Sequence, residues 1–358
     1  MSADYVSNQE IIQAAYRNLS RNVWDYLVGA AESETTLRRN RVALDSLAFL
    51  PRVLRDVEKV DPSTTFMGHR LRIPVFMAPV GSLQTIIPGG AAPVTKAAHA
   101  FGTINFVSSV TDPPLEETAS LTPHPKVFQL YVRGDMKWIE ELLDRVKAAG
   151  YAGLCLTVDA AYYGIRERQL MNRWLPPSVQ RETNRHLQAK LTWDSMAHIK
   201  EYCGLPFVLK GVATAADAKL AVEHGVDVVY VSNHGGRELD HGRGTMQMLP
   251  EIVDAVAGRA EIAVDGGMLR GTDVLKALCL GATAVGIGRL QGWALAAGGE
   301  AALVRALELV EREVVNAMGL IGVTSVGQLG RDYVCGTEPV GPCHEMSTFT
   351  HMPGGRLF

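Results

Sequence analysis

Short apolar runs alternate with helical patterns from about residue 73 onward, and this rhythm dominates the chain. Continuous apolar strands are typical of parallel sheets that helices cover on both faces. Eight such runs in a strand–helix rhythm predict an α/β fold of the (β/α)8 TIM-barrel type. The predicted strands are residues 74–78, 104–108, 127–131, 154–158, 207–209, 228–231, 262–264 and 284–287.

Helix signals fill the segments between these runs. Asp135 can cap a helix that ends before Gly150. Thr214 and Asp217 form a capping box ahead of a helix that Gly225 terminates. No linker or low-complexity stretch interrupts residues 73–320, so we expect one barrel there, with residues 300–318 as its last helix.

The flanking segments complete a single predicted domain that spans residues 1–358. An N-terminal helical segment (1–72), with helices at 7–19, 23–31 and 35–45, is expected to cap one mouth of the barrel. Residues 162–191 form the longest connection after a strand, a length typical of a lid loop. The tail, residues 321–358, is rich in Gly and Pro and is expected to wrap the outside.

Composition narrows the class of partner. The chain has 358 residues, 47% of them hydrophobic, and a net charge of −3 with both signs scattered along it. This balance argues against nucleic acid or an anionic membrane as the main partner. No apolar run is long enough for a membrane span, and the N-terminus lacks a signal-peptide pattern. The five cysteines are an odd number without metal-ligand spacing, which predicts reduced thiols, no metal and a cytoplasmic protein.

Polar residues gather where the predicted strands end. In this fold all eight strands deliver their carboxyl ends to one face, where active sites lie. Glycine-rich turns after the last two strands commonly bind phosphate, which makes Gly266, Gly267, Gly288 and Arg289 a predicted phosphate cradle. Lys210 and three polar neighbours offer donors and acceptors suited to a flat heterocycle, so flavin mononucleotide (FMN) is the expected cofactor. Those neighbours are Gln129, Thr157 and Ser232.

The segment after the sixth strand points to a small organic acid as ligand. His234 can move a proton near neutral pH, and Arg237 can bind a carboxylate through two parallel hydrogen bonds. Simpler structural roles exist for several other candidates. Asp159 could cap a helix, Lys210 could form a structural salt bridge, and the turn at Asp265 could be ordinary. Tyr26 and Tyr131 could be packing residues, and Arg166 could be a solvated charge.

Taken together, these motifs identify a family resemblance. From about residue 5 to about 330, the chain resembles the FMN-dependent 2-hydroxy-acid oxidases and dehydrogenases. That family includes glycolate oxidase, lactate oxidase, mandelate dehydrogenase and the flavin domain of flavocytochrome b2. The motifs that carry the resemblance are Asp25-Tyr26, Ala78-Pro79, Phe128-Gln129-Leu130-Tyr131, Leu156-Thr157-Val158-Asp159, Leu209-Lys210-Gly211, residues 232–240, Asp265-Gly266-Gly267 and Ile287-Gly288-Arg289.

The resemblance implies a role for each candidate residue. His234 would take the substrate proton, and Asp159 would orient and stabilise its imidazole. Arg237 would bind the carboxylate with Tyr26 and Arg166, while Tyr131 would hydrogen-bond near the reacting oxygen. Lys210 would stabilise negative charge on the reduced flavin. The implied cofactor-binding residues are Ala78, Pro79, Val80, Ser108, Gln129, Thr157, Lys210, Ser232, Asp265, Gly266, Gly267, Arg270, Gly288 and Arg289.

Departures from the family pattern shape the substrate hypothesis. Val110 stands where glycolate oxidase-like members often carry Trp, and Gly81 where many short-chain enzymes carry Ala. Both changes remove volume, which predicts an (S)-2-hydroxy acid bulkier than glycolate, mandelate-like or branched. Residues 160–166 lack the usual Pro-Arg-x-Gly-Arg-Arg pattern. Leu269 replaces an expected phosphate-side Arg, which either weakens FMN binding or shifts the phosphate contacts to Arg270 and Arg289.

Several alternatives stay open at this point. The lid carries Arg173, Arg181, Arg185 and Lys190 without an amphipathic anchor, which predicts a soluble enzyme. Family habit suggests a homotetramer. The electron acceptor is open among oxygen, a quinone and a cytochrome. A type 2 isopentenyl diphosphate isomerase-like FMN enzyme and a non-catalytic flavin or acid sensor are the competing functions.

Overall fold

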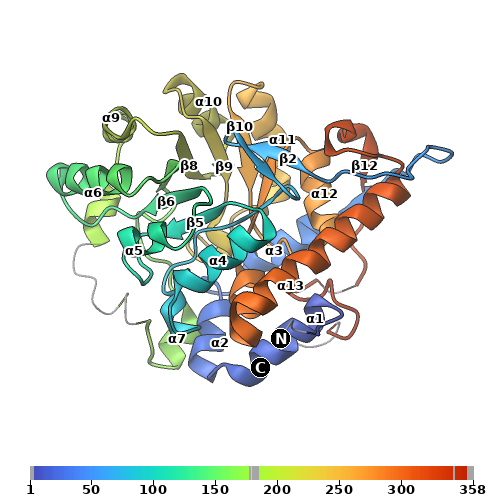
Figure 1. Ribbon diagram of the computed structural model, residues 1–358, viewed down its shortest axis with the longest axis horizontal. Helices are drawn as coiled ribbons and strands as arrows, with labels where there is room; N and C mark the ends of the chain where they lie inside the picture. The colour runs from blue at the N-terminus through green and yellow to red at the C-terminus, as the bar shows by residue number, and fades with distance from the viewer. Residues whose placement is uncertain (1–3, 177–178, 180–184, 342, 353–358) are drawn as a thin grey trace.

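A closed barrel of eight parallel strands forms the centre of the computed structural model, which describes residues 4–176, 179, 185–341 and 343–352 (Figure 1). Each strand pairs with the next along the chain, and β11 pairs with β4 to close the barrel. The predicted (β/α)8 fold is therefore confirmed. The barrel strands are β4 (Val75–Met77), β5 (Asn105–Ser108), β6 (Lys126–Leu130), β7 (Gly153–Thr157), β8 (Phe207–Val212), β9 (Val228–Val231), β10 (Glu261–Val264) and β11 (Ala284–Ile287).

Helices surround the barrel, and their ends follow the capping signals. Asp135 accepts a hydrogen bond from the Trp138 amide at the start of α6, and Thr214 does the same for Asp217 at the start of α10. The helices outside the N-terminal segment are α4 (Ala91–Phe101), α5 (Leu115–Ser120), α6 (Met136–Ala148), α7 (Glu167–Met171), α9 (Trp193–Cys203), α10 (Ala215–Glu223), α11 (Thr245–Val256), α12 (Gly271–Cys279) and α13 (Arg289–Ile321).

The predicted last helix at residues 300–318 forms the second part of α13. Helix α13 begins at Arg289, directly after β11, but its backbone angles are non-helical at Gly298 and Gly299, which divide it into two helical parts. The shorter part that begins at Arg289 was not predicted. Helix α13 packs against both α1 and α4 along the outside of the barrel (Figure 1).

The N-terminal segment is helical as predicted, but it also contains strands. Helices α1 (Asn8–Asn18), α2 (Arg21–Val28) and α3 (Thr35–Asp45) lie within three residues of the predicted bounds. Two hairpin strands, β2 (Thr64–Phe66) and β3 (His69–Leu71), were not predicted. They carry Phe66 and Leu71, which are buried with the interior side chains of the barrel and fill one of its ends.

The C-terminal tail returns to the N-terminal segment. Strand β12 (Val334–Gly336) pairs antiparallel with β1 (Leu47–Phe49). Beyond it, Met346 and Phe349 are buried in the main hydrophobic core. Residues 353–358 of the predicted tail, and Arg181 of the predicted lid, lie outside the described residues. Within the lid, the structure describes helix α7 and a 3-10 helix at Arg185–Lys190.

Three further observations concern membrane-spanning helices, disulfides and metal sites. No helix in the described part of the chain is long and apolar enough to cross a bilayer. The five cysteines are all free, and Cys155, Cys203 and Cys279 are buried. Within the same described ranges, no cluster of three potential metal ligands occurs.

Candidate active site

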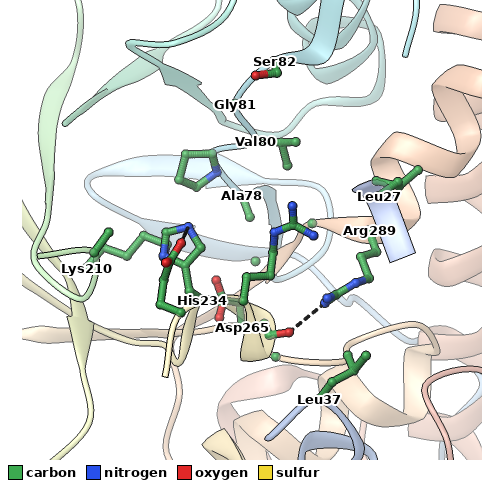
Figure 2. Close-up of a pocket in the computed structure, with 18 of the residues that line it drawn as sticks. Leu27, Leu37, Ala78, Val80, Gly81, Ser82, Lys210, His234, Asp265 and Arg289 are labelled. Carbon is green, nitrogen blue, oxygen red and sulfur yellow. Dashed lines mark hydrogen bonds and ion pairs between the residues drawn. The ribbon is translucent and has the colours of Figure 1, made fainter. Parts of the chain in front are cut away.

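One cavity lies at the carboxyl ends of the barrel strands, where the sequence placed the site. Figure 2 shows Lys210 and His234 on one side of it, Arg289 on the other, and the turn from Ala78 to Ser82 above them. The predicted residues that line the cavity are Tyr26, Ala78, Pro79, Val80, Gly81, Val110, Tyr131, Arg166, Lys210, His234, Arg237, Asp265, Gly266, Gly267, Gly288 and Arg289.

His234 is held between two hydrogen-bonding partners. Its Nδ1 lies 2.9 Å from Asp159 Oδ1, and its Nε2 lies 3.1 Å from the Tyr131 hydroxyl. Its backbone has φ 56°, a left-handed conformation that the following Gly235 continues at φ 64°. A Cβ on Gly235 would lie 2.7 Å from Arg289 Nη1. The glycine therefore makes room for this guanidinium, in addition to bordering the cavity.

Asp159 stays ionised although only 13% of its side chain is exposed. Burial raises the pKa of a carboxyl group, but Lys210 and His234 outweigh that effect and hold the pKa of Asp159 below its usual value. Gly211 permits the approach of this carboxylate, because a Cβ there would lie 2.6 Å from Asp159 Cβ. The ring nitrogen facing an ionised Asp159 carries the proton, which leaves Nε2 available as a base.

Lys210 is a buried cation beside two carboxylates. Its Nζ donates to Ser232 Oγ at 3.1 Å and lies 3.8 Å from Asp159 Oδ2. Burial lowers the pKa of a lysine, but Asp159 and Asp265 more than compensate and raise the pKa of Lys210. Lys210 therefore keeps its positive charge at the base of the cavity.

Buried hydrogen bonds link neighbouring strands beneath the cavity. On one side, Ser108 donates to Gln129, whose amide donates to Thr157. On the other, Ser232 and Tyr230 donate to the two oxygens of Asp265. Ser108, Gln129, Thr157, Asp159 and Ser232 do not themselves line the cavity. They support the residues that do.

Two arginines at the cavity lack an acidic partner. Arg237 Nη1 donates to the carbonyls of Tyr26 and Gly29 at 2.7 and 2.8 Å. Arg289 donates to the carbonyls of Val28, Gly29 and Gly235. In the described ranges no carboxylate lies within ion-pair distance of either guanidinium.

Burial without an ion pair lowers the pKa of both guanidiniums. Burial, with repulsion from Arg166, lowers the pKa of Arg237. Burial, with repulsion from Arg237, lowers the pKa of Arg289 to about 9. Buried charges in proteins are normally paired. Two unpaired guanidiniums in one cavity therefore mark two places for anions supplied by ligands.

The other two predicted arginines are already paired. Arg166 Nη2 lies 2.6 Å from Glu238 Oε1, and both side chains are buried. Arg270 pairs with Glu313 at 3.0 Å and does not line the cavity. Leu269 lines the cavity, but its amide donates to Asp273. Phosphate contacts therefore have more support from Arg289 than from Arg270.

The residues behind the substrate-size hypothesis face each other. A Cβ on Gly81 would lie 2.6 Å from Val110 Cγ2, so Val110 already occupies the place of a larger side chain at position 81. The Tyr26 hydroxyl donates to the Gly81 carbonyl at 2.9 Å, which places Tyr26 at the same edge of the cavity. A Trp at position 110 would reduce the cavity at this edge.

The cavity has the features that an FMN phosphate requires. Helix α13 begins at its rim, and the first amides of a helix have no partner within the helix. Nothing lies within 4 Å of a Cβ built on Gly288, the residue before Arg289. Open space, free helix amides and an unpaired guanidinium together form a site for a phosphate dianion.

Some cavity residues were missed by the sequence analysis. Glu238 directly follows Arg237, and its charge within the polar motif at residues 232–240 could have identified it as a site residue. Tyr163, whose hydroxyl accepts from Arg166 Nη1 at 2.6 Å, was seen only as part of an altered segment. Arg41 comes from α3 and Glu345 from the tail, far along the chain from the strand ends, so no local pattern marks them.

Comparisons with known proteins agree with this geometry. Residues 15–336 match the family model described as FMN-dependent dehydrogenase. Glycolate oxidase 1 from Oryza sativa subsp. indica is 38% identical over 342 residues, covering 89% of this chain and 93% of the relative. The L-lactate oxidase of a Nostoc species is 36% identical over 352 residues, covering 91% and 96%.

Solved structures of mandelate oxidase are also similar. The complex with 3,3-difluoro-2-hydroxy-3-phenylpropionic acid has a TM-score of 0.87 and 38% identity, covering 94% of this chain and 100% of that one. A mandelate oxidase variant with an FMN adduct has a TM-score of 0.84 and 37% identity, covering 91% and 98%. The family match ends at residue 336, so Glu345 reaches the cavity from outside the matched region.

Proposed function

Because the chain belongs to the FMN-dependent dehydrogenase family, we propose that it oxidises an (S)-2-hydroxy acid to the 2-oxo acid with His234 as the base. It is an FMN-dependent oxidoreductase of the 2-hydroxy-acid oxidase type. The observation that carries the proposal is the arrangement of His234 between Asp159 and Tyr131, beside an arginine without an acidic partner.

Each residue then has a defined task. Arg237 binds the substrate carboxylate, and Tyr26 borders the same end of the cavity. His234 Nε2 takes a proton from the substrate, and Asp159 stabilises the resulting imidazolium. FMN, when bound, accepts the two electrons that the substrate loses. Lys210 keeps a positive charge where negative charge develops, and Gly288 with Arg289 holds the phosphate.

The size of the substrate is the finer part of the proposal. Gly81 and Val110 both line the cavity, and their small side chains support a mandelate-like or branched acid over glycolate. The mandelate oxidase structures support this choice. The glycolate and lactate oxidase relatives are about equally identical to this chain, so identity alone does not decide it.

The acceptor and assembly are further parts of the proposal. The relatives named above are oxidases, which supports oxygen as the electron acceptor over a quinone or a cytochrome. Hydrogen peroxide formed in step with the 2-oxo acid would support oxygen. A homotetramer in the cytoplasm stays a prediction, which light scattering and cell fractionation can test.

Anaerobic reduction of the purified holoenzyme tests the reaction. We expect mandelate to bleach the yellow flavin, and His234→Gln to slow bleaching by about 100- to 10,000-fold while FMN stays bound. Glu313→Gln, at an ion pair away from the cavity, should bleach at the normal rate. A yellow protein that no 2-hydroxy acid bleaches would instead support the isomerase-like or sensor function.

A further inference from the structure

Glu238 is a buried carboxylate at the centre of the proposed substrate site. Its Oε1 lies 2.6 Å from Arg166 Nη2 and 3.9 Å from His234 Nε2. Its Oε2 accepts a hydrogen bond from the Gly164 amide at 2.6 Å. The side chain is only 7% exposed. It therefore borders the space beside the proposed base, where the reacting carbon of a substrate must lie.

Glu238 leaves Arg166 with little capacity for another anion. Arg166 donates from Nη2 to Glu238, from Nη1 to the Tyr163 hydroxyl, and from Nε to the Arg237 carbonyl. Burial lowers the pKa of a buried guanidinium, but Glu238 more than compensates and raises the pKa of Arg166. The charge is neutralised and all three nitrogens are engaged.

Arg237 and Arg289 differ from Arg166 in this respect. Their hydrogen-bond acceptors are backbone carbonyls, which leave their charge available. Arg289 is proposed to bind the FMN phosphate, and Lys210 lies beside Asp159, so Arg237 is left to bind the first substrate carboxylate. A second substrate carboxylate beside Arg166 would lie near both Glu238 and Asp159.

We propose that Glu238 is the specificity-determining residue that restricts this site to hydroxy acids with a single carboxylate. The inference rests on the proposed function and adds the charge of the substrate to it. Specificity of this kind arises from repulsion of the wrong ligand as much as from attraction of the right one. Replacing the Glu238 carboxylate with an amide keeps its shape but frees Arg166 to act as a second anion anchor.

A pair of unreactive ligands tests this on the holoenzyme. Propionate and malonate differ by one carboxylate, and their dissociation constants can be measured from changes in flavin absorbance. We expect the wild type to prefer propionate by roughly tenfold or more. Glu238→Gln should move the ratio toward malonate by at least about tenfold, because a hydrogen bond to a charged group is formed in place of a repulsion.

Two further variants separate the causes. The double variant Arg166→Met/Glu238→Gln should lose the gain, since Arg166 would be the second anchor. Glu313→Gln is the matched control, because Glu313 also pairs with an arginine (Arg270) and accepts a glycine amide (Gly271), but at a distance from the cavity. It should keep the wild-type ratio. FMN content and melting temperature of each variant check that the fold is kept.

The outcomes separate this inference from the proposed function. The inference is overturned if the wild type binds malonate as tightly as propionate, a measurement that needs no variant. It is also overturned if Glu238→Gln leaves the ratio unchanged, or if the gain survives in the double variant. If monocarboxylic hydroxy acids bleach the flavin in any of these cases, the proposed function stands. If none bleaches it but the ligand ratios follow expectation, only the reaction is wrong.

Discussion

Arg289 allows a sharp test, because its replacement should affect the apoprotein and FMN binding in different ways. At about 1.4 kcal/mol per pH unit, a pKa lowered from 12.5 to about 9 corresponds to roughly 5 kcal/mol against the charged form. The three hydrogen bonds to backbone carbonyls offset about 1 kcal/mol each. Arg289→Met should therefore leave the unfolding free energy of the apoprotein unchanged or raise it by up to about 2 kcal/mol.

FMN binding should respond in the opposite direction. A charge-assisted hydrogen bond to phosphate contributes about 1.5–3 kcal/mol, so Arg289→Met should weaken FMN binding and raise its dissociation constant by roughly 10- to 150-fold. Urea unfolding of the apoprotein gives the unfolding free energy, and quenching of FMN fluorescence gives the FMN dissociation constant.

Arg168 supplies the matched comparison. It is also largely buried, but it pairs with Glu34 at 2.7 Å and with Asp25 at 3.5 Å. Arg168→Met removes the ion pair with Glu34, while Asp25 keeps its ion pair with Arg21 at 2.6 Å, and should destabilise the apoprotein by about 3 kcal/mol. Equal destabilisation by Arg289→Met and Arg168→Met, or unchanged FMN affinity in Arg289→Met, would refute the assignment of Arg289 as an unpaired phosphate ligand.

Three other substitutions test separate parts of the structure. Hydrogen bonds from Thr36 and Ser33 hold the pKa of Asp240 well below its usual value despite the opposing effect of burial, so its stabilising contribution is complete above about pH 4 and is lost as the pH falls further. In Asp240→Asn, the unfolding free energy should therefore fall less steeply as the pH drops below about 4. The same steepness as in the wild type would contradict this. Tyr230→Phe removes the donor to Asp265 and should weaken FMN binding by roughly fivefold, measured by fluorescence quenching; unchanged affinity would show that this bond does not position Asp265. Val110→Trp puts a larger side chain at the cavity edge beside Gly81 and should lower the ratio of kcat/KM for mandelate to kcat/KM for glycolate at least tenfold, whereas an unchanged ratio would place the substrate side chain elsewhere.

The barrel was predictable because each of its strands is an apolar run buried on both sides, a strong local signal. The hairpin strands β2 and β3 and the β1–β12 pair were missed for the opposite reason. Each is three residues long and partly exposed, so it shows neither a long apolar run nor clear alternation. The sequence placed the last helix after the break at Gly298 and Gly299, where the structure has its second helical part, but missed the shorter part that begins at Arg289.

At the site, residue types at strand ends were predictable, but their pairing was not. The motif around His234 indicated proton transfer and carboxylate binding from the sequence alone. The sequence could not show that Arg166 is neutralised by Glu238, 72 positions away. Nor could it show that Arg270 turns toward Glu313, on another helix. Both outcomes depend on tertiary packing that brings distant charges within 3 Å.

The end of helix α2 explains how two cations can stay available in a buried site. The carbonyls of Tyr26, Val28 and the capping Gly29 accept from Arg237 and Arg289. Carbonyls at a helix C-terminus lack partners within the helix and carry partial negative charge, so they hold a guanidinium in place without neutralising it. A carboxylate in their position would stabilise the apoprotein more strongly but would compete with the ligand anions. The N-terminal segment, although outside the barrel, is therefore part of the candidate active site.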